Sequence, residues 1–126
     1  MIDIFIAEDD RDLQRLYELL LDMSGFHVVG FASNGDEAIE MFKKFQEKPD
    51  IIILDYRMPI KNGIDALKAI LEIDGSTRVI FASADRTIKE IVYLNGAMGF
   101  LDKPFTHKKL VSTLKNILDI PKPIHM

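Results

Sequence analysis

The residues Ile51-Ile52-Ile53-Leu54, followed directly by Asp55, decide the fold of this 126-residue chain. The four apolar residues show no polar alternation, a pattern typical of a strand covered on both faces in the centre of a parallel sheet. A run of four residues is far too short to span a membrane, so it predicts a buried strand. An acid at the end of such an apolar strand indicates a group that is held there for a purpose.

Four further apolar segments predict strands on either side of this one, at residues 2–7, 26–32, 78–82 and 100–101. After each strand, apolar residues recur at helical spacing, most clearly in the last segment, with Leu110, Val111, Leu114, Ile117 and Leu118. Five strands therefore alternate with five helices. Helical crossovers make the sheet parallel, and right-handed connections place helices on both of its faces. The sequence predicts a doubly wound α/β fold.

Local signals mark where three of these helices begin. Asn34 precedes an acid, Glu37, by three residues, as an N-cap does, and Thr106 is a candidate cap for the last helix. The Asn-Gly pairs at 34–35 and 62–63 would ordinarily indicate hairpins. Because helical periodicity follows each pair, both are interpreted as helix starts.

Composition limits what the chain can do. It contains no cysteine, which excludes disulfides, zinc–thiolate sites, iron–sulfur clusters and a thiol nucleophile. The net charge of −4 argues against direct binding of nucleic acid. The N-terminus lacks the basic and apolar regions of a signal peptide, so we expect a cytoplasmic domain with no membrane contact. We expect this domain at residues 1–120, with residues 121–126 as a tail or the start of a linker.

Polar side chains follow four of the predicted strands at the points where the strands end. These residues are Glu8, Asp9 and Asp10, then Asp55, then Ser83, and finally Lys103. Since the carboxyl ends of parallel strands meet at one edge of an open sheet, we expect these side chains to lie together. Two carboxylates about 5 Å apart repel each other by roughly 3 kcal/mol at an effective dielectric constant of 20. Such a cluster must raise a pKa or recruit a cation.

Each of these residues alone has an ordinary structural interpretation. The three acids could favour the start of a helix, Asp55 could be a turn or cap residue, Ser83 could be an N-cap, and Lys103 could be a surface charge. Their joint occurrence at strand ends favours a functional site. Oxygen ligands without histidine or cysteine suit Mg²⁺. A carboxylate beside Mg²⁺, a lysine and a hydroxyl is an arrangement that can accept a phosphoryl group.

Five motifs in order resemble the receiver domain of two-component response regulators, of the chemotaxis-regulator kind, over residues 2 to about 119. They are Ile6-Ala7-Glu8-Asp9-Asp10, Ile53-Leu54-Asp55-Tyr56-Arg57-Met58-Pro59 with Asn62-Gly63, Phe81-Ala82-Ser83-Ala84, Gly96-Ala97-Met98-Gly99-Phe100, and Lys103-Pro104-Phe105. The resemblance implies a flavodoxin-like sheet with strand order 2-1-3-4-5. It also implies a cis peptide bond between Lys103 and Pro104.

Carried over residue by residue, the resemblance implies that Asp55 is the phosphoryl acceptor. Asp9, Asp55 and the backbone carbonyl of Arg57 would ligate Mg²⁺ directly, and Glu8 would act through water. Mn²⁺ is a possible substitute for Mg²⁺. The phosphoryl group would come from the phosphohistidine of a sensor histidine kinase or phosphotransfer protein, or from a small acyl phosphate. The domain would catalyse its own phosphorylation and dephosphorylation, and so would be a signalling domain and not an enzyme.

The same resemblance assigns the switch. Ser83 would donate its hydroxyl to the phosphoryl group, Lys103 would pair with it, and Phe100 would be the aromatic switch residue that turns inward. The surface of the fourth helix, fifth strand and fifth helix would then signal to a protein partner or output domain. Arg57 and Asp85, each two residues beyond a site residue, are hypothesised flanking modulators that pair across the site and restrict the attacking water.

Four positions depart from the commonest family pattern. Glu8 replaces an aspartate, Ser83 a threonine and Phe100 a tyrosine, so acid, hydroxyl and aromatic ring are all kept. Phe100 lacks the phenol, which removes any switch that depends on that hydrogen bond. Gly99 stands where the winged-helix transcription factors carry an acid, which argues against dimerisation in their manner.

Three alternatives stay open at this point. A flavodoxin-like redox protein would need a Ser/Thr/Gly-rich phosphate loop, where this chain has acids, and an aspartyl-phosphate phosphatase would need an acid at Arg57. A receiver-like interaction module that is never phosphorylated is the third. Beside the acids, Arg11, Leu13 and Leu16 are candidate kinase contacts, although a leucine at position 16 is more often a core residue.

Overall fold

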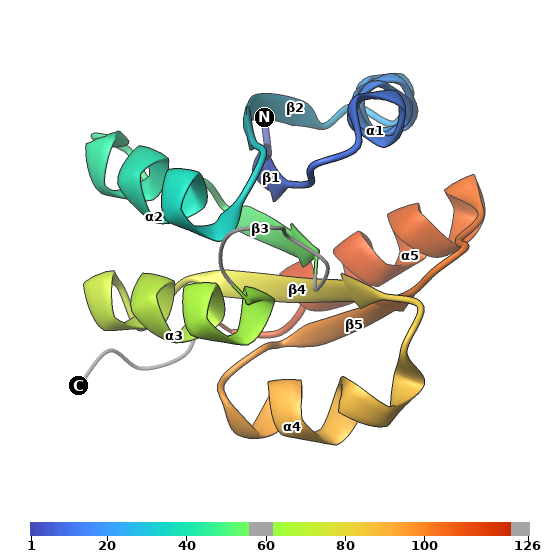
Figure 1. Cartoon of the computed structure of the whole chain (residues 1–126). Coiled ribbons are helices and arrows are strands. Elements are labelled where there is room, and N and C mark those ends of the chain that lie inside the picture. Colours follow the sequence, from blue (N-terminus) through green and yellow to red (C-terminus); the bar gives the residue numbers. More distant parts are fainter. Residues whose placement is uncertain (56–61, 122–126) are drawn as a thin grey trace.

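A computed structural model describes residues 1–55 and 62–121 of the chain. Its elements alternate in the predicted order and include one short 3-10 helix, η1 (Figure 1). They are β1 (Asp3–Ala7), α1 (Arg11–Met23), β2 (His27–Ala32), α2 (Gly35–Lys44), β3 (Ile51–Asp55), α3 (Gly63–Ile73), β4 (Arg78–Ser83), η1 (Arg86–Ile88), α4 (Lys89–Leu94), β5 (Gly99–Asp102) and α5 (His107–Leu118). No helix in the described part of the chain is long and apolar enough to cross a membrane.

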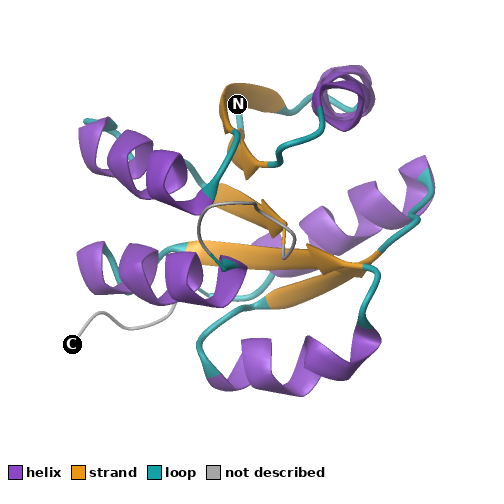
Figure 2. Ribbon diagram, in the orientation of Figure 1, coloured by secondary structure: helices purple, strands orange, loops and turns teal. Residues whose placement is uncertain are grey.

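The five strands form one parallel sheet in the order β2-β1-β3-β4-β5, as predicted. Helices cover both faces (Figure 2). The buried side chains of α2, α3 and α4 belong to the hydrophobic cluster on one face, and those of α1 and α5 to the cluster on the other. The predicted fold class, a doubly wound and flavodoxin-like α/β fold, is confirmed.

β3 lies in the middle of the sheet, between β1 and β4. The side chains of residues 51–54 are at most 1% exposed. Ile52 and Leu54 belong to one cluster, and Ile51 and Ile53 to the other. Because both faces of the strand are covered, neither set of alternate positions can be polar. Each such aliphatic side chain contributes about 1.5–3 kcal/mol when fully buried.

The helix starts at the carboxyl edge of the sheet are fixed by capping side chains, as the sequence predicts. Asn34 Oδ1 accepts the backbone N–H of Glu37 at 2.8 Å. Asn62 and Thr106 cap α3 and α5 in the same way, at 2.7 Å and 3.0 Å. Caps of this kind typically stabilise a helix by about 1 kcal/mol. They hold in place the connections that surround the polar strand ends.

Two strands extend one residue further than predicted. β3 includes Asp55, which pairs in register with Ala82, and β4 includes Ser83, which pairs with Asp102. The apolar pattern ends before these polar residues, which is why the prediction stopped short. Both residues are therefore part of the sheet, which positions side chains more precisely than a loop does.

The sequence patterns misplace two apolar residues. Leu16, which would more often be a core residue, is 44% exposed, because Tyr17 and Leu21 form the buried face of α1. Ile91 of α4 has the helical spacing of a core residue relative to Ile88, yet it is 47% exposed. That helix opens with the 3-10 turn η1, which shifts the faces of the residues that follow.

Candidate functional site

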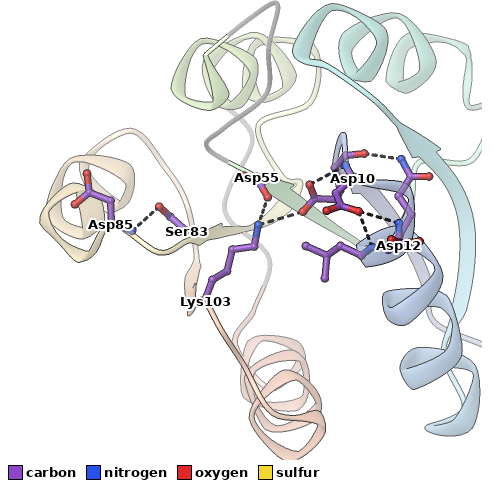
Figure 3. A network of polar contacts seen from close by, with 9 residues as sticks. Asp10, Asp12, Asp55, Ser83, Asp85 and Lys103 are labelled. Carbon is purple, nitrogen blue, oxygen red and sulfur yellow. Dashed lines mark hydrogen bonds and ion pairs between the residues drawn. The ribbon is translucent and has the colours of Figure 1, made fainter.

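The polar strand ends meet at the carboxyl edge of the sheet. Glu8 follows β1, Asp55 ends β3, Ser83 ends β4, and Lys103 follows β5. Glu8, Asp55 and Ser83 are only 2%, 3% and 2% exposed, and such deep burial is rare for the two acids. Figure 3 shows Lys103 reaching toward Asp55, with Ser83 beside Asp85 on the neighbouring strand end. The structure thus brings these predicted site residues together.

Lys103 connects the two buried acids. Its Nζ donates a hydrogen bond to Glu8 Oε1 at 3.1 Å and a second one to Asp55 Oδ2. Burial alone would lower the pKa of Lys103, but the hydrogen bonds and charges of Asp55 and Glu8 outweigh it and raise that pKa. The lysine is therefore fully charged at neutral pH. Its backbone N–H also donates to the carbonyl of Ser83 at 3.0 Å, which ties β5 to β4 at this point.

The electrostatic environment of Glu8 disfavours its ionised form. Its pKa is raised from 4.5 to about 8, first by burial, then by its hydrogen bond and charge interaction with Asp55 and by a hydrogen bond with Asp9. Lys103 acts in the opposite direction and is not enough to restore the ordinary value. One ammonium group thus leaves the cluster with surplus negative charge. A further cation would stabilise the ionised form of Glu8.

The three acids after β1 have three different positions. Glu8 is buried in the site, and its Oε2 accepts the backbone N–H of Asp10 at 3.2 Å. Asp9 is exposed. Asp10 is the N-cap of α1 and accepts the N–H groups of Asp12 and Leu13 at 2.8 Å and 3.2 Å. The helix-start interpretation is therefore correct for Asp10 and wrong for Glu8.

Ser83 is not the N-cap of the following helix. That cap is Asp85, whose Oδ1 accepts the N–H of Thr87 at 3.0 Å. The Ser83 hydroxyl instead accepts the N–H of Asp85 at 2.9 Å, at the mouth of the site. Arg57, predicted as a carbonyl ligand and as a partner for Asp85, lies outside the described residues.

The donor set fits a hard dication. Glu8, Asp9 and Asp55 supply carboxylate oxygens without nitrogen or sulfur, which is what Mg²⁺ prefers. Within residues 1–55 and 62–121, no three histidine, cysteine or acidic side chains are already gathered in the spacing of a metal site. Lys103 takes the place between the two buried acids in this state. The raised pKa of Glu8 is the observation that favours a cation here.

Phe100, the predicted switch residue, is 7% exposed and pairs in register with Phe81 on β4. Its ring belongs to the same hydrophobic cluster as the buried residues of α2 and α3. Lys89 Nζ lies 5.9 Å from its centroid. The ring is therefore already packed inward in this structure, and the predicted cis bond between Lys103 and Pro104 is also present.

Gly63 supports the site in a way that the sequence analysis missed. A Cβ atom at this position would lie 2.7 Å from Cζ of Phe81 and 2.9 Å from the backbone carbonyl oxygen of Asp55. Only a residue without a side chain allows α3 to start this close to the end of β3. The Asn62-Gly63 pair was noticed as a helix start, but a motif does not show which neighbour the glycine faces.

Comparison with known proteins agrees with this geometry. Residues 4–115 match the family model described as the response regulator receiver domain. The chain is 34% identical to the chemotaxis protein CheY of Thermotoga maritima, over 90% of this chain and 95% of that protein. It is also 34% identical to the transcriptional regulatory protein CpxR of Escherichia coli, where it covers 94% of this chain and half of that protein.

Among solved structures, the chain is similar to a CheX–CheY–BeF3–Mg²⁺ complex from Borrelia burgdorferi. The TM-score is 0.90 at 26% identity, over 94% of this chain and 90% of that one. The sheet order, the buried acids joined by a lysine and the match to the family model all agree. The chain belongs to the response regulator receiver domains, signalling domains of two-component systems that act as phosphoacceptors and not as classical enzymes.

Proposed function

We propose that Asp55 accepts a phosphoryl group in a Mg²⁺-dependent reaction. The observation that carries this proposal is the buried carboxylate at the end of the central strand, held by Lys103 beside a second buried acid. An oxygen of Asp55 attacks the phosphorus atom, and the bond from phosphorus to the donor breaks. The donor is the phosphohistidine of a sensor kinase or phosphotransfer protein, whose imidazole leaves, or a small acyl phosphate, whose carboxylate leaves.

The neighbours of Asp55 have complementary roles in this reaction. Glu8, Asp9, Asp55 and the carbonyl of Arg57 would hold Mg²⁺ or Mn²⁺, which neutralises charge on the phosphoryl oxygens. Lys103 turns from Asp55 to a phosphoryl oxygen, for which its raised pKa keeps it charged.

The switch follows from two contacts of the free protein. The Ser83 hydroxyl accepts the N–H of Asp85, so a turn of Ser83 toward a phosphoryl oxygen changes the connection into η1. Phe100 belongs to the same hydrophobic cluster as Ile88 of η1. A shift between two packings would alter the surface of α4, β5 and α5, which then binds a protein partner or output domain.

Arg57 and Asp85 are the proposed modulators of dephosphorylation. If they pair, the Arg57→Ala and Asp85→Ala effects on its rate will not be additive.

A hollow beside Lys103 is the proposed contact surface for the kinase or phosphotransfer protein. It has a volume of about 300 Å³ and is lined mostly by apolar residues: Leu13, Leu16, Ala84, Pro104 and Phe105, with Lys103. Arg11, at the start of α1, is exposed. The partner would bring its phosphohistidine over this surface to Asp55. No membrane or nucleic-acid contact is part of the proposal.

We further propose that the receiver domain spans residues 1–120, with a tail or linker from residue 121 and a cytoplasmic location. The end of α5 at Leu118 supports this boundary, and so does the backbone carbonyl of Ile120, which accepts a hydrogen bond from Arg78 Nη2 at 3.0 Å.

One experiment tests the central claim. The protein is incubated with an acyl phosphate and Mg²⁺, and its mass is measured. We expect the mass of one phosphoryl group to be added to the unmutated protein and to Asp50→Asn, a control at the other end of β3. We expect none on Asp55→Asn. No added mass on the unmutated protein, or equal labelling of Asp55→Asn, would exclude the proposal. A flavin absorbance band would favour the redox alternative.

A further inference from the structure

A buried hydroxyl next to the site has no assigned role. Tyr17, on the inner face of α1, is 1% exposed. Its hydroxyl has no hydrogen-bond partner among the described residues. Leaving a buried polar group without a partner costs about 1–3 kcal/mol, so such a group in a folded protein calls for an explanation. A phenylalanine would fill the same space without that cost.

The hydroxyl lies within electrostatic reach of the site. Side chains on a helix lean toward its N-terminus, so the phenol of Tyr17 lies over the turn that carries Leu13 and Gln14. Gln14 Nε2 donates to the backbone carbonyl of Glu8 at 2.5 Å, which places that turn directly beside the buried acid. Burial raises the pKa of Tyr17, and the charges of Glu8 and Asp55 raise it further.

The ring of Tyr17 also contacts the segment that carries the lysine of the site. Its centroid lies 5.2 Å from that of Phe105, at an interplanar angle of 31°. Phe105 is two residues beyond Lys103 and on the same cluster face as Leu21 and Leu110. Tyr17 therefore packs against the segment that follows Lys103 and lies within electrostatic range of Glu8.

Glu8 loses a donor when the site is occupied. In the free protein its Oε1 accepts from Lys103 and its Oε2 from the N–H of Asp10. The proposed function, on which this inference rests, takes Lys103 to a phosphoryl oxygen on Asp55. Oε1 of this buried carboxyl group is then left without that charged donor, and leaving a buried polar atom without a partner is costly.

We propose that Tyr17 is a positioning residue whose hydroxyl donates a hydrogen bond to the Glu8 carboxylate once Lys103 has turned to the phosphoryl group. The phenol holds Glu8 in place in the occupied site and makes no hydrogen bond with the described residues in the free protein. This accounts for a hydroxyl that is buried, has no partner among the described residues and lies within electrostatic range of Glu8. Hydrogen bonds to charged groups are stronger than neutral ones, so the effect on occupied-site affinity is measurable.

The test is Tyr17→Phe, which removes one oxygen atom and keeps the packing against Phe105. The control is Ser112→Ala, which also removes one hydroxyl, at a position on α5 where that hydroxyl donates to the carbonyl of Lys109 within the helix. Calorimetry measures the affinity for Mg²⁺ alone, where Lys103 stays on Glu8, and for beryllofluoride with Mg²⁺, where it does not. Urea unfolding measures the stability of the free protein.

We expect Tyr17→Phe to bind beryllofluoride with Mg²⁺ about tenfold more weakly. Its affinity for Mg²⁺ alone and the midpoint of its unfolding should not decrease. Ser112→Ala should match the unmutated protein in both binding measurements. An unchanged beryllofluoride affinity, or an equal loss in both binding measurements, would overturn the role of Tyr17 and leave the proposed function intact. If the unmutated protein does not bind beryllofluoride, the proposed function itself fails, and this inference with it.

Discussion

The two ends of β3 carry the same residue type in two different settings. At the amino end, Asp50 Oδ2 accepts the backbone N–H of Asp3 at 2.7 Å, and the N–H of Asp50 donates to the carbonyl of Asp3 at 2.9 Å. At the carboxyl end, Asp55 meets the charged groups of Lys103 and Glu8. An acid paired with backbone joins two strands. Two acids that share one lysine create a site whose negative potential can attract a cation.

The largest effect should come from removing the shared lysine. Lys103→Met leaves Glu8 and Asp55 as neighbouring buried acids, and breaking a buried ion pair costs about 3 kcal/mol. Urea unfolding at pH 9, above the pKa of Glu8, checks this value. At pH 5 the loss should be smaller, because Glu8 is then protonated. An equal loss at both pH values would show that the lysine stabilises the fold by packing and not by charge.

A second effect is the pH dependence of stability. The pKa of Glu8 is about 8 in the folded chain and 4.5 in the unfolded one. Between these values the folded chain binds the extra proton, so the free energy of unfolding must fall as pH rises. We expect a fall of about 2 kcal/mol between pH 6 and 8 from this group.

Denaturant titrations at several pH values measure this slope. Glu8→Gln, which imitates the neutral carboxyl group, should be flatter and more stable than the unmutated protein at pH 8. Asp50→Asn should keep the original slope. If Glu8→Gln and the unmutated protein showed the same slope, the charge on Glu8 would not be the source of the pH dependence.

The smallest effect belongs to the amino end of β3. Asp50→Ala removes the acceptor for the N–H of Asp3, which should cost about 1 kcal/mol. The loss should be the same at pH 5 and pH 8, and labelling by an acyl phosphate should proceed as before. Loss of labelling in this variant would mean that the two ends of the strand are coupled, contrary to the distinction drawn between them.

Much of the fold could be predicted from the sequence, because the deciding pattern is local. The uninterrupted apolar run before Asp55 indicates a central parallel strand, and the caps Asn34, Asn62 and Thr106 lie where their residue types predict. The order of the strands is different. It was implied by the resemblance to the family, since no periodicity along one strand identifies its neighbours in the sheet.

The site could be predicted as a set of residues but not as a set of contacts. That Glu8, Asp55 and Lys103 meet follows from strand ends that share one edge. That Asp10 and Asp85 are caps could not be distinguished from a site role, because capping depends on backbone angles and not on residue type alone. The position of the Tyr17 hydroxyl beside the site could not be predicted, since helical spacing does not show what a side chain contacts at its tip.

A substitution at Gly63, which is not a reactive residue, can also disrupt this site. Alanine at this position would press on the ring of Phe81 and on the backbone of Asp55, so it would displace the acceptor without altering any acid, hydroxyl or lysine. For the interpretation of sequence variants, a receiver chain with every reactive residue intact can still be inactive. Variation at this glycine therefore belongs with variation at the reactive residues when a chain of this family is judged competent.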